Sequence, residues 1–236
     1  MLIRSVKHLW HRELAGDPET HAWVLSLYRA GEFHPQTDAD YFPADAADSP
    51  ELRASIERHA ADEARHVKIY DRAIARLGQP RTEFEGLDVF NVAIRTYTGV
   101  DFSTQGVTAR DAVADRLANF LAHAYFLEMR ISHSLEFHLE ACERLGRSEV
   151  ARAIHTVHAD EERHTSYTLE AVKELLPAAR AAEVLEVHRR GEARANLAFS
   201  ARQVRSFLAR FKSSRSHAFV YRASASMMEA GLVALS

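Results

Sequence analysis

The chain has 236 residues, of which 47% are hydrophobic and 27% charged, with a formal net charge of −3 at pH 7. This composition is typical of a soluble globular protein, and the length suits a single domain over residues 1–236. Such a small charge gives no general attraction to nucleic acid or membrane. One cysteine, Cys142, excludes an internal disulfide, a Cys₄ iron centre and a cysteine-rich zinc site. No apolar run approaches the ~20 residues of a membrane-spanning helix and no signal-peptide pattern is evident, so we expect a cytoplasmic location.

Apolar residues recur with the helical period along most of the chain, whereas the alternating pattern of strands is nearly absent. The predicted helices span about 2–15, a segment that starts at Asp17-Pro18, 50–77, 109–145, 148 to just before Pro177, 178–212 and 217–234. A Pro-, Asp- and Ala-rich stretch covers 34–50, and the long 79–109 connection contains a possible helical piece at 87–97. The sequence therefore predicts an all-α protein.

Connection lengths indicate how these helices pack. The short turn at Gly146-Arg147 makes the two helices beside it antiparallel neighbours, whereas the 79–109 connection can cross the length of a bundle. Two helical hairpins joined by such a crossover form a ferritin-like four-helix bundle. We expect this bundle over about 17–175, with an N-terminal helix at 2–15 and accessory C-terminal helices at 178–234.

Two hexapeptides in the chain are nearly identical: ADEARH, which ends at His66, and ADEERH, which ends at His164, 98 residues later. Each contains a glutamate (Glu63 or Glu161) three residues before the histidine. On a helix, residues three apart project from nearly the same face, so each pair is half of a metal site. Two such pairs face to face would hold two metal ions.

Three carboxylates fall on the apolar faces of the predicted helices: Glu63, Glu128 and Glu161. A buried, unpaired carboxylate costs several kcal/mol, so converging carboxylates are expected to bind cations. Glu32 is the predicted fourth carboxylate, because it precedes Glu63 by 31 residues, close to the 33 between Glu128 and Glu161. Pro35 would end the helix just beyond Glu32, and Glu19 is therefore the alternative.

The predicted ligands are Glu32, Glu63, His66, Glu128, Glu161 and His164. Their oxygen and imidazole donors match the di-metal carboxylate pattern of helical bundles and suit iron or manganese. Asp62 and Asp160 are each expected to accept the ring N–H of the histidine on the opposite helix, and Arg65 and Arg163 to neutralise these aspartates. Other histidines near the motifs, including His59, suit the polar surroundings of such a site.

With these motifs, the chain resembles the ferritin-like di-iron carboxylate superfamily, which includes ferritins, rubrerythrins and bacterial di-iron oxygenases. The Asp-Glu-x-Arg-His form is most similar to the oxygenase branch. Three segments also resemble tRNA hydroxylases that act on a hypermodified adenosine: Gly31-Glu32-Phe33, Ala75–Pro80 and Phe126–Arg130. The resemblance implies that the six ligands hold an iron pair that activates O₂. Residues 35–50 and those after 178 differ from the pattern of that family.

We therefore expect a di-iron or manganese/iron oxygenase that hydroxylates or oxidises an organic substrate, either a small molecule or a modified nucleoside. Four tyrosines lie within a turn of predicted ligands and are candidates to line its pocket, or else ordinary core aromatics: Tyr28, Tyr70, Tyr125 and Tyr167. With one cysteine, the chain would need an external electron donor of the ferredoxin or reductase type.

Two other functions fit the sequence. The first is ferritin- or rubrerythrin-like iron handling or peroxide removal. The second is partner binding through the basic segment 189–215, which could dock RNA or an acidic carrier protein, unless its phenylalanines pack on the bundle while the basic face is solvated. A homodimer is a further expectation.

Overall fold

The computed structural model describes residues 2–32 and 42–235, which form eight α-helices and no β-strand. The helices are α1 (Leu2–Gly16), α2 (Pro18–Glu32), α3 (Pro50–Arg76), α4 (Phe90–Thr98), α5 (Arg110–Arg144), α6 (Ser148–Leu175), α7 (Ala178–Arg210) and α8 (Arg215–Ala234). Two short 3₁₀ helices, η1 (Ala44–Ala46) and η2 (Gly86–Asp88), lie in the connections before α3 and α4. The all-α prediction is confirmed. Part of the predicted 34–50 stretch, residues 34–41, lies outside the described residues.

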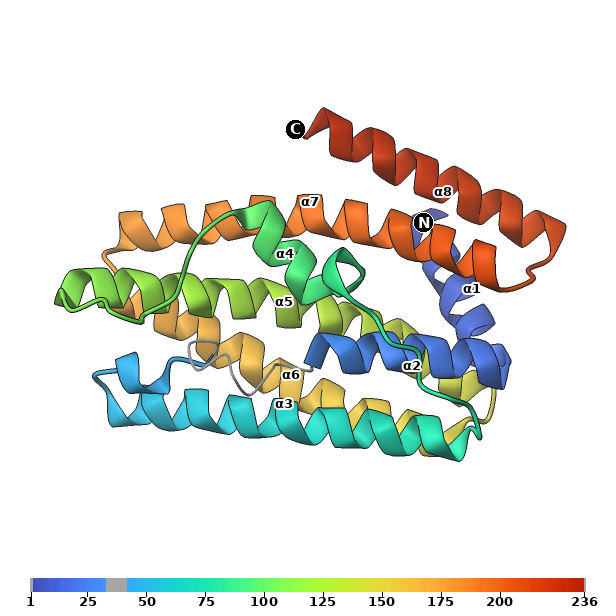
Figure 1. The fold of residues 1–236 in the computed structure, drawn as a ribbon, viewed down its shortest axis with the longest axis horizontal. Helices are drawn as coiled ribbons and strands as arrows, with labels where there is room; N and C mark the ends of the chain where they lie inside the picture. Colours follow the sequence, from blue (N-terminus) through green and yellow to red (C-terminus); the bar gives the residue numbers. More distant parts are fainter. Residues whose placement is uncertain (1, 33–41, 236) are drawn as a thin grey trace.

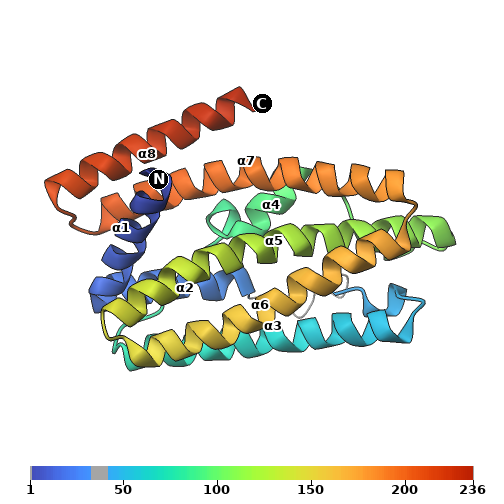
Figure 2. The ribbon, with the colours of Figure 1, turned by 180° about the vertical axis from the view of Figure 1, so that it is seen from behind.

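The turn between α5 and α6 depends on one glycine. Gly146 has a φ of +68°, the left-handed conformation that glycine adopts without strain. The amide of Arg147 donates to the carbonyl of Cys142 at 2.8 Å, which closes the end of α5 before α6 starts at Ser148. This short turn brings α5 and α6 back alongside each other as antiparallel neighbours (Figure 2).

Helices α2, α3, α5 and α6 run roughly along the long axis of the molecule (Figure 1). Helix α2 is antiparallel to α3, and α5 is antiparallel to α6, so the chain forms two helical hairpins. The connection after α3 contains α4 and runs back to the opposite end of the molecule before α5 begins. Helix α7 packs along α5 on its other side, α8 packs on α7, and α1 contacts α2 and α5 at one end.

Two apolar clusters fill opposite ends of the α3–α5–α6 core. One contains Tyr70, Leu135 and Ile154, and the other contains Ile56 and Leu121, each almost fully buried. The clusters are separated along each helix: the middle of α3, α5 and α6 contributes carboxylates and histidines instead of aliphatic side chains. The core is therefore apolar at both ends and polar in the middle.

The phenylalanines of the basic segment 189–215 pack inward from α7 and its end. Phe207 is fully buried, and Phe199 lies 5.1 Å from the ring of Phe90 between centroids. Several of the arginines pair with acids of the same protein: Arg205, for example, contacts Glu229 at 2.5 Å. A role of this segment in binding RNA or a carrier protein stays a prediction. In the described residues, none of the helices is both long and apolar enough to traverse a membrane.

Candidate metal centre

The polar middle of the bundle contains four buried glutamates, one from each of α2, α3, α5 and α6. The exposed fractions of Glu32, Glu63, Glu128 and Glu161 are 2%, 3%, 2% and 0%. Each lies on the inner face of its helix because it occupies a position of the apolar stripe. Three buried histidines lie among them: His59, His66 and His164.

The first group of side chains consists of Glu32, Glu63, His66 and Glu161, whose donor atoms all lie within 4.8 Å of one another. Nδ1 of His66 is 3.4 Å from Oε2 of Glu32, 3.6 Å from Oε1 of Glu63 and 3.3 Å from Oε1 of Glu161. One imidazole nitrogen thus faces three carboxylates at the same point. This arrangement could hold one metal ion.

The second group consists of His59, Glu63, Glu128 and His164, again with donor atoms within 4.8 Å of one another. Nε2 of His59 is 3.5 Å from Oε1 of Glu63 and 3.4 Å from Oε1 of Glu128, and Nδ1 of His164 is 3.7 Å from Oε1 of Glu63. Glu63 belongs to both groups. The two groups therefore adjoin each other across a shared carboxylate, as in a dinuclear site.

The structure brings the six predicted ligands together, and Glu32 rather than Glu19 is the carboxylate from α2. Glu19 is exposed in the first turn of that helix. His59 is not among the six predicted ligands. A signal for it exists, because His59 precedes Glu63 by four residues and His66 by seven and so shares their helix face.

The two histidines of the repeated motif make crossed contacts with the aspartates of the opposite copy. Nε2 of His66 lies 3.1 Å from Oδ2 of Asp160, and Nε2 of His164 lies 3.3 Å from Oδ2 of Asp62. A carboxylate can only accept at this distance, so each Nε2 can donate a proton to its aspartate, while each Nδ1 faces the inner carboxylates, where a cation would stand in place of a proton. The contacts thus orient both imidazoles with Nδ1 toward the point where a metal would bind.

Two arginines connect these aspartates. Arg65 donates to Asp62 at 2.7 Å and to Asp160 at 2.5 Å, and Arg163 donates to Asp62 at 2.5 Å and to Asp160 at 2.9 Å. Although burial raises the pKa of Asp160, its bonds to His66 and Arg163 outweigh burial and lower the pKa overall. Asp160 therefore remains ionised and able to accept from His66.

Three of the inner carboxylates each have one oxygen without a hydrogen bond in the described part of the chain. Oε1 of Glu32, Oε2 of Glu128 and Oε1 of Glu161 are buried and make no hydrogen bond there. Burial raises the pKa of Glu161 well above its usual range, and the charges of Glu128, Glu32 and Glu63 raise it further. Four carboxylates this close cannot all be ionised without added positive charge. Bound cations would supply that charge and complete the coordination of these oxygens.

Two of the four candidate tyrosines lie at the centre. The hydroxyl of Tyr167 is 2.8 Å from Nδ1 of His59, which leaves Nε2 of that histidine directed at the carboxylates. Tyr70 is fully buried, and its hydroxyl makes no hydrogen bond to any described residue. Burial raises the pKa of Tyr70, and the nearby Glu32 and Glu161 raise it further.

The other two tyrosines lie further away. The hydroxyl of Tyr28 is 3.3 Å from that of Ser134, and its ring packs 6.0 Å from that of Tyr70 between centroids. Tyr125 packs against Phe126 in the apolar cluster formed with α4 and α7. Tyr125 is therefore not brought to the carboxylates, because it faces a different helix from Glu128.

Comparisons of the chain with protein-family models, with curated proteins and with solved structures found no match. The chemistry of the residues themselves is therefore the basis for a functional assignment.

Proposed function

We propose that this protein binds a pair of iron ions between α2, α3, α5 and α6 and uses them to oxidise an organic substrate with O₂. The observation that carries the proposal is the pair of adjoining four-residue groups that share Glu63. Four carboxylates carry four negative charges, which two divalent ions would balance. Mixed carboxylate and imidazole donors suit iron or manganese, so a manganese/iron pair is the alternative composition.

The proposed ligands divide into two sets around Glu63. Glu32, His66 and Glu161 would hold one ion, and His59, Glu128 and His164 the other. The hairpin order α2–α3 and α5–α6, with α4 in the crossover, supports a ferritin-like assignment of this bundle.

A reduced iron pair supplies the activation of O₂ when it is bound. The protein's own residues provide orientation and exclude water. Asp62 and Asp160 hold the two motif histidines with their Nδ1 atoms inward, and Tyr167 orients His59. The apolar clusters on either side close the centre to solvent. We further propose an external electron donor of the ferredoxin or reductase type, since a single cysteine cannot build an iron–sulfur relay.

A second candidate is iron handling or peroxide removal, as in ferritins and rubrerythrins. The observation that favours it is that the seven inner residues are buried and that the surface cavity lined by Ile69, Arg76 and Arg147 contains none of them. Size-exclusion chromatography separates iron storage from the oxygenase proposal, because an iron-storage shell contains many subunits. A shell of about 24 subunits would overturn the oxygenase proposal in favour of storage.

The test of the proposal is metal analysis of protein produced with iron. We expect two ions per chain, and the loss of stoichiometric binding in Glu63→Ala and His164→Ala. His158→Ala is the matched control, because His158 is half-buried on α6 and contacts Ser132 outside both groups. Unchanged metal content in both ligand variants would reject the assignment. Anaerobic reduction and O₂ addition, followed by absorbance, then tests whether the bound pair reacts with O₂.

A further inference from the structure

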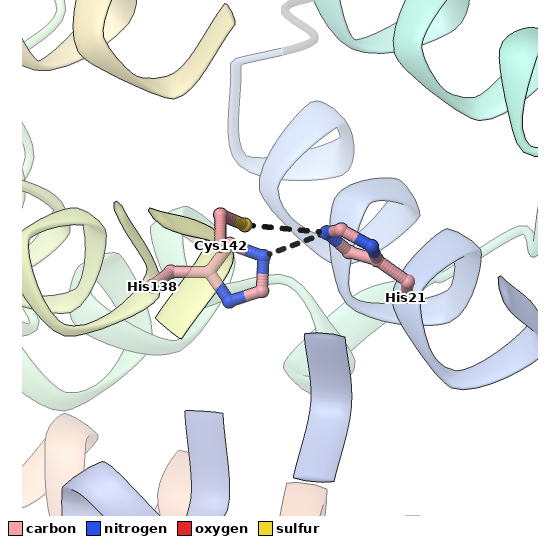
Figure 3. Close-up of side chains that lie close together, drawn as sticks. All are labelled: His21, His138 and Cys142. Carbon is pink, nitrogen blue, oxygen red and sulfur yellow. Dashed lines mark hydrogen bonds between the residues drawn. The ribbon is translucent and has the colours of Figure 1, made fainter. Parts of the chain in front are cut away.

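A second set of metal-binding side chains lies where α1, α2 and α5 meet. His21 of α2 faces His138 and Cys142 of α5, and all three are fully buried (Figure 3). His11 of α1 lies beside His138 and is 6% exposed. None of these residues belongs to the carboxylate centre.

The three donor atoms all lie within 4.8 Å of one another, close enough to share one ion. Nε2 of His138 lies 3.2 Å from Nε2 of His21, and Sγ of Cys142 lies 3.6 Å from the same nitrogen. With metal–nitrogen bonds of about 2.0 Å and a metal–sulfur bond of about 2.3 Å, trigonal coordination places two nitrogens roughly 3.5 Å apart and nitrogen and sulfur roughly 3.7 Å apart. The two spacings at Nε2 of His21 are close to these values, so His21 could share an ion with either partner with little movement of α2 against α5.

His11 occupies the position of a supporting residue. Its Nδ1 lies 3.4 Å from Nδ1 of His138. When Nδ1 of His138 carries the ring proton, it donates a hydrogen bond to Nδ1 of His11. The lone pair on Nε2 of His138 then points toward His21 and Cys142. Histidines that bind metals commonly donate their other ring N–H in this way.

We propose that His21, His138 and Cys142 bind one copper ion, at a site separate from the carboxylate centre. A thiolate is a soft ligand, and two imidazoles with one thiolate in a trigonal arrangement are typical of copper. Zinc in structural sites takes four ligands almost without exception, whereas this group offers three donors among the described residues. Copper binding releases the proton of the Cys142 thiol.

The two centres share no ligand. Tyr28 and Tyr70 lie between them: the ring of Tyr28 is 5.5 Å from that of His138 and 6.0 Å from that of Tyr70 between centroids. The soft site and the carboxylate site also select different metals. We therefore expect each centre to load without the other.

The experiment adds copper to the full-length protein in two forms. Copper(I) is added anaerobically with a competing colorimetric chelator, and copper(II) is added separately for absorption spectroscopy. We expect one equivalent of copper(I) to be retained, and copper(II) to produce an intense visible thiolate-to-copper charge-transfer band. The chain has one cysteine, so such a band must come from Cys142. Cys142→Ser should lose the band and retain less than a tenth of the copper, with its iron content unchanged.

His188→Gln is the matched control, since His188 is also fully buried but bonds to Asn119 outside any of the ligand groups. It should retain copper as the wild type does. His21→Asn is the second ligand variant, should Cys142→Ser misfold. Two results would show that these side chains form only a hydrogen-bonded network. One is a folded wild-type protein that lacks the band, and the other is a wild-type protein that retains no more copper than Cys142→Ser. One equivalent of zinc retained against equimolar copper would also overturn the proposal.

Discussion

His66 on α3 contacts Asp160 on α6, with 3.1 Å between Nε2 and Oδ2, and the pair joins the two copies of the repeated hexapeptide. The reciprocal contact is that of His164 with Asp62, at 3.3 Å. Each copy of the motif thus provides the acceptor that orients the histidine of the other copy. The two copies therefore work together, and each needs the aspartate directly before its glutamate to orient the histidine of the other copy.

Replacing Asp160 by asparagine should weaken metal binding without removing a ligand. An amide does not hold the N–H of His66 as strongly as a carboxylate, and the loss of such a supporting contact lowers affinity about 10–100-fold. Competition with a metal chelator measures the change. Asp71→Asn is the control. Asp71 forms an ion pair with Arg29, with 2.6 Å between Oδ1 and Nε, and belongs to neither group of predicted ligands. Equal affinities in the wild type and Asp160→Asn would contradict the orienting role.

Glu161→Gln should have opposite effects on the metal-free and the iron-loaded protein. Without metal, Glu161 must either repel the other carboxylates or take up a proton, and the substitution removes this cost, so we expect the free energy of unfolding to rise by about 1–2 kcal/mol. With iron, the stabilisation by bound metal should largely disappear, because Glu161 is a proposed ligand. Denaturant unfolding of both forms at neutral pH measures each effect. A metal-free variant less stable than the wild type would argue against repulsion among these carboxylates.

His188 should make the stability of the protein depend on pH. Burial lowers the pKa of His188 to about 4, below the 6.5 of an exposed histidine. As the pH falls from 6.5 to about 4, the unfolded chain takes up a proton that the folded protein excludes, so the free energy of unfolding falls. The loss reaches about 2 kcal/mol at pH 5, since each pKa unit is worth about 1.4 kcal/mol.

His188→Gln lacks this dependence and can still bond to Asn119. The difference in unfolding free energy between the two proteins should therefore shift in favour of the variant between pH 7 and pH 5. Denaturant unfolding at several pH values measures it. A difference that stays constant over this range would be evidence against a neutral, buried His188.

Gly191→Ala should force α4 and α7 apart. A Cβ at this position would lie 2.1 Å from Oγ1 and 2.8 Å from Cα of Thr98, and the second contact is to backbone that cannot rotate away. We expect a loss of about 1–3 kcal/mol in the free energy of unfolding. Gly231→Ala is the control, because a Cβ there would lie 3.5 Å from its nearest neighbour, Cδ1 of Leu197. We expect this variant to gain about 0.5–1 kcal/mol in the free energy of unfolding, since alanine favours the helix more than glycine does. Thermal unfolding measures the stability of both variants. Similar changes in the two would exclude a close approach of α4 to α7 at Gly191.

Much of the architecture is determined locally and could be predicted from the sequence. Helical periodicity, capping residues and the glycine at 146 act over a few neighbouring residues, so the helices and the antiparallel pairing of α5 and α6 follow from the chain itself. The apolar stripes also place Glu63, Glu128 and Glu161 inside, because a stripe position is buried whichever residue occupies it. The repeat adds His66 and His164 through helix geometry alone.

The contacts between side chains of different helices could not be predicted from the sequence and are known only from the tertiary structure. His59 shares a helix face with Glu63, but its place beside Glu128 and Tyr167 depends on how α5 and α6 cross α3. The meeting of His21 with His138 and Cys142 depends likewise on the packing of α2 against α5, for which no spacing along the chain provides a signal. Crossing angle and rotation are set by the whole set of side chains at an interface, and not by any short segment.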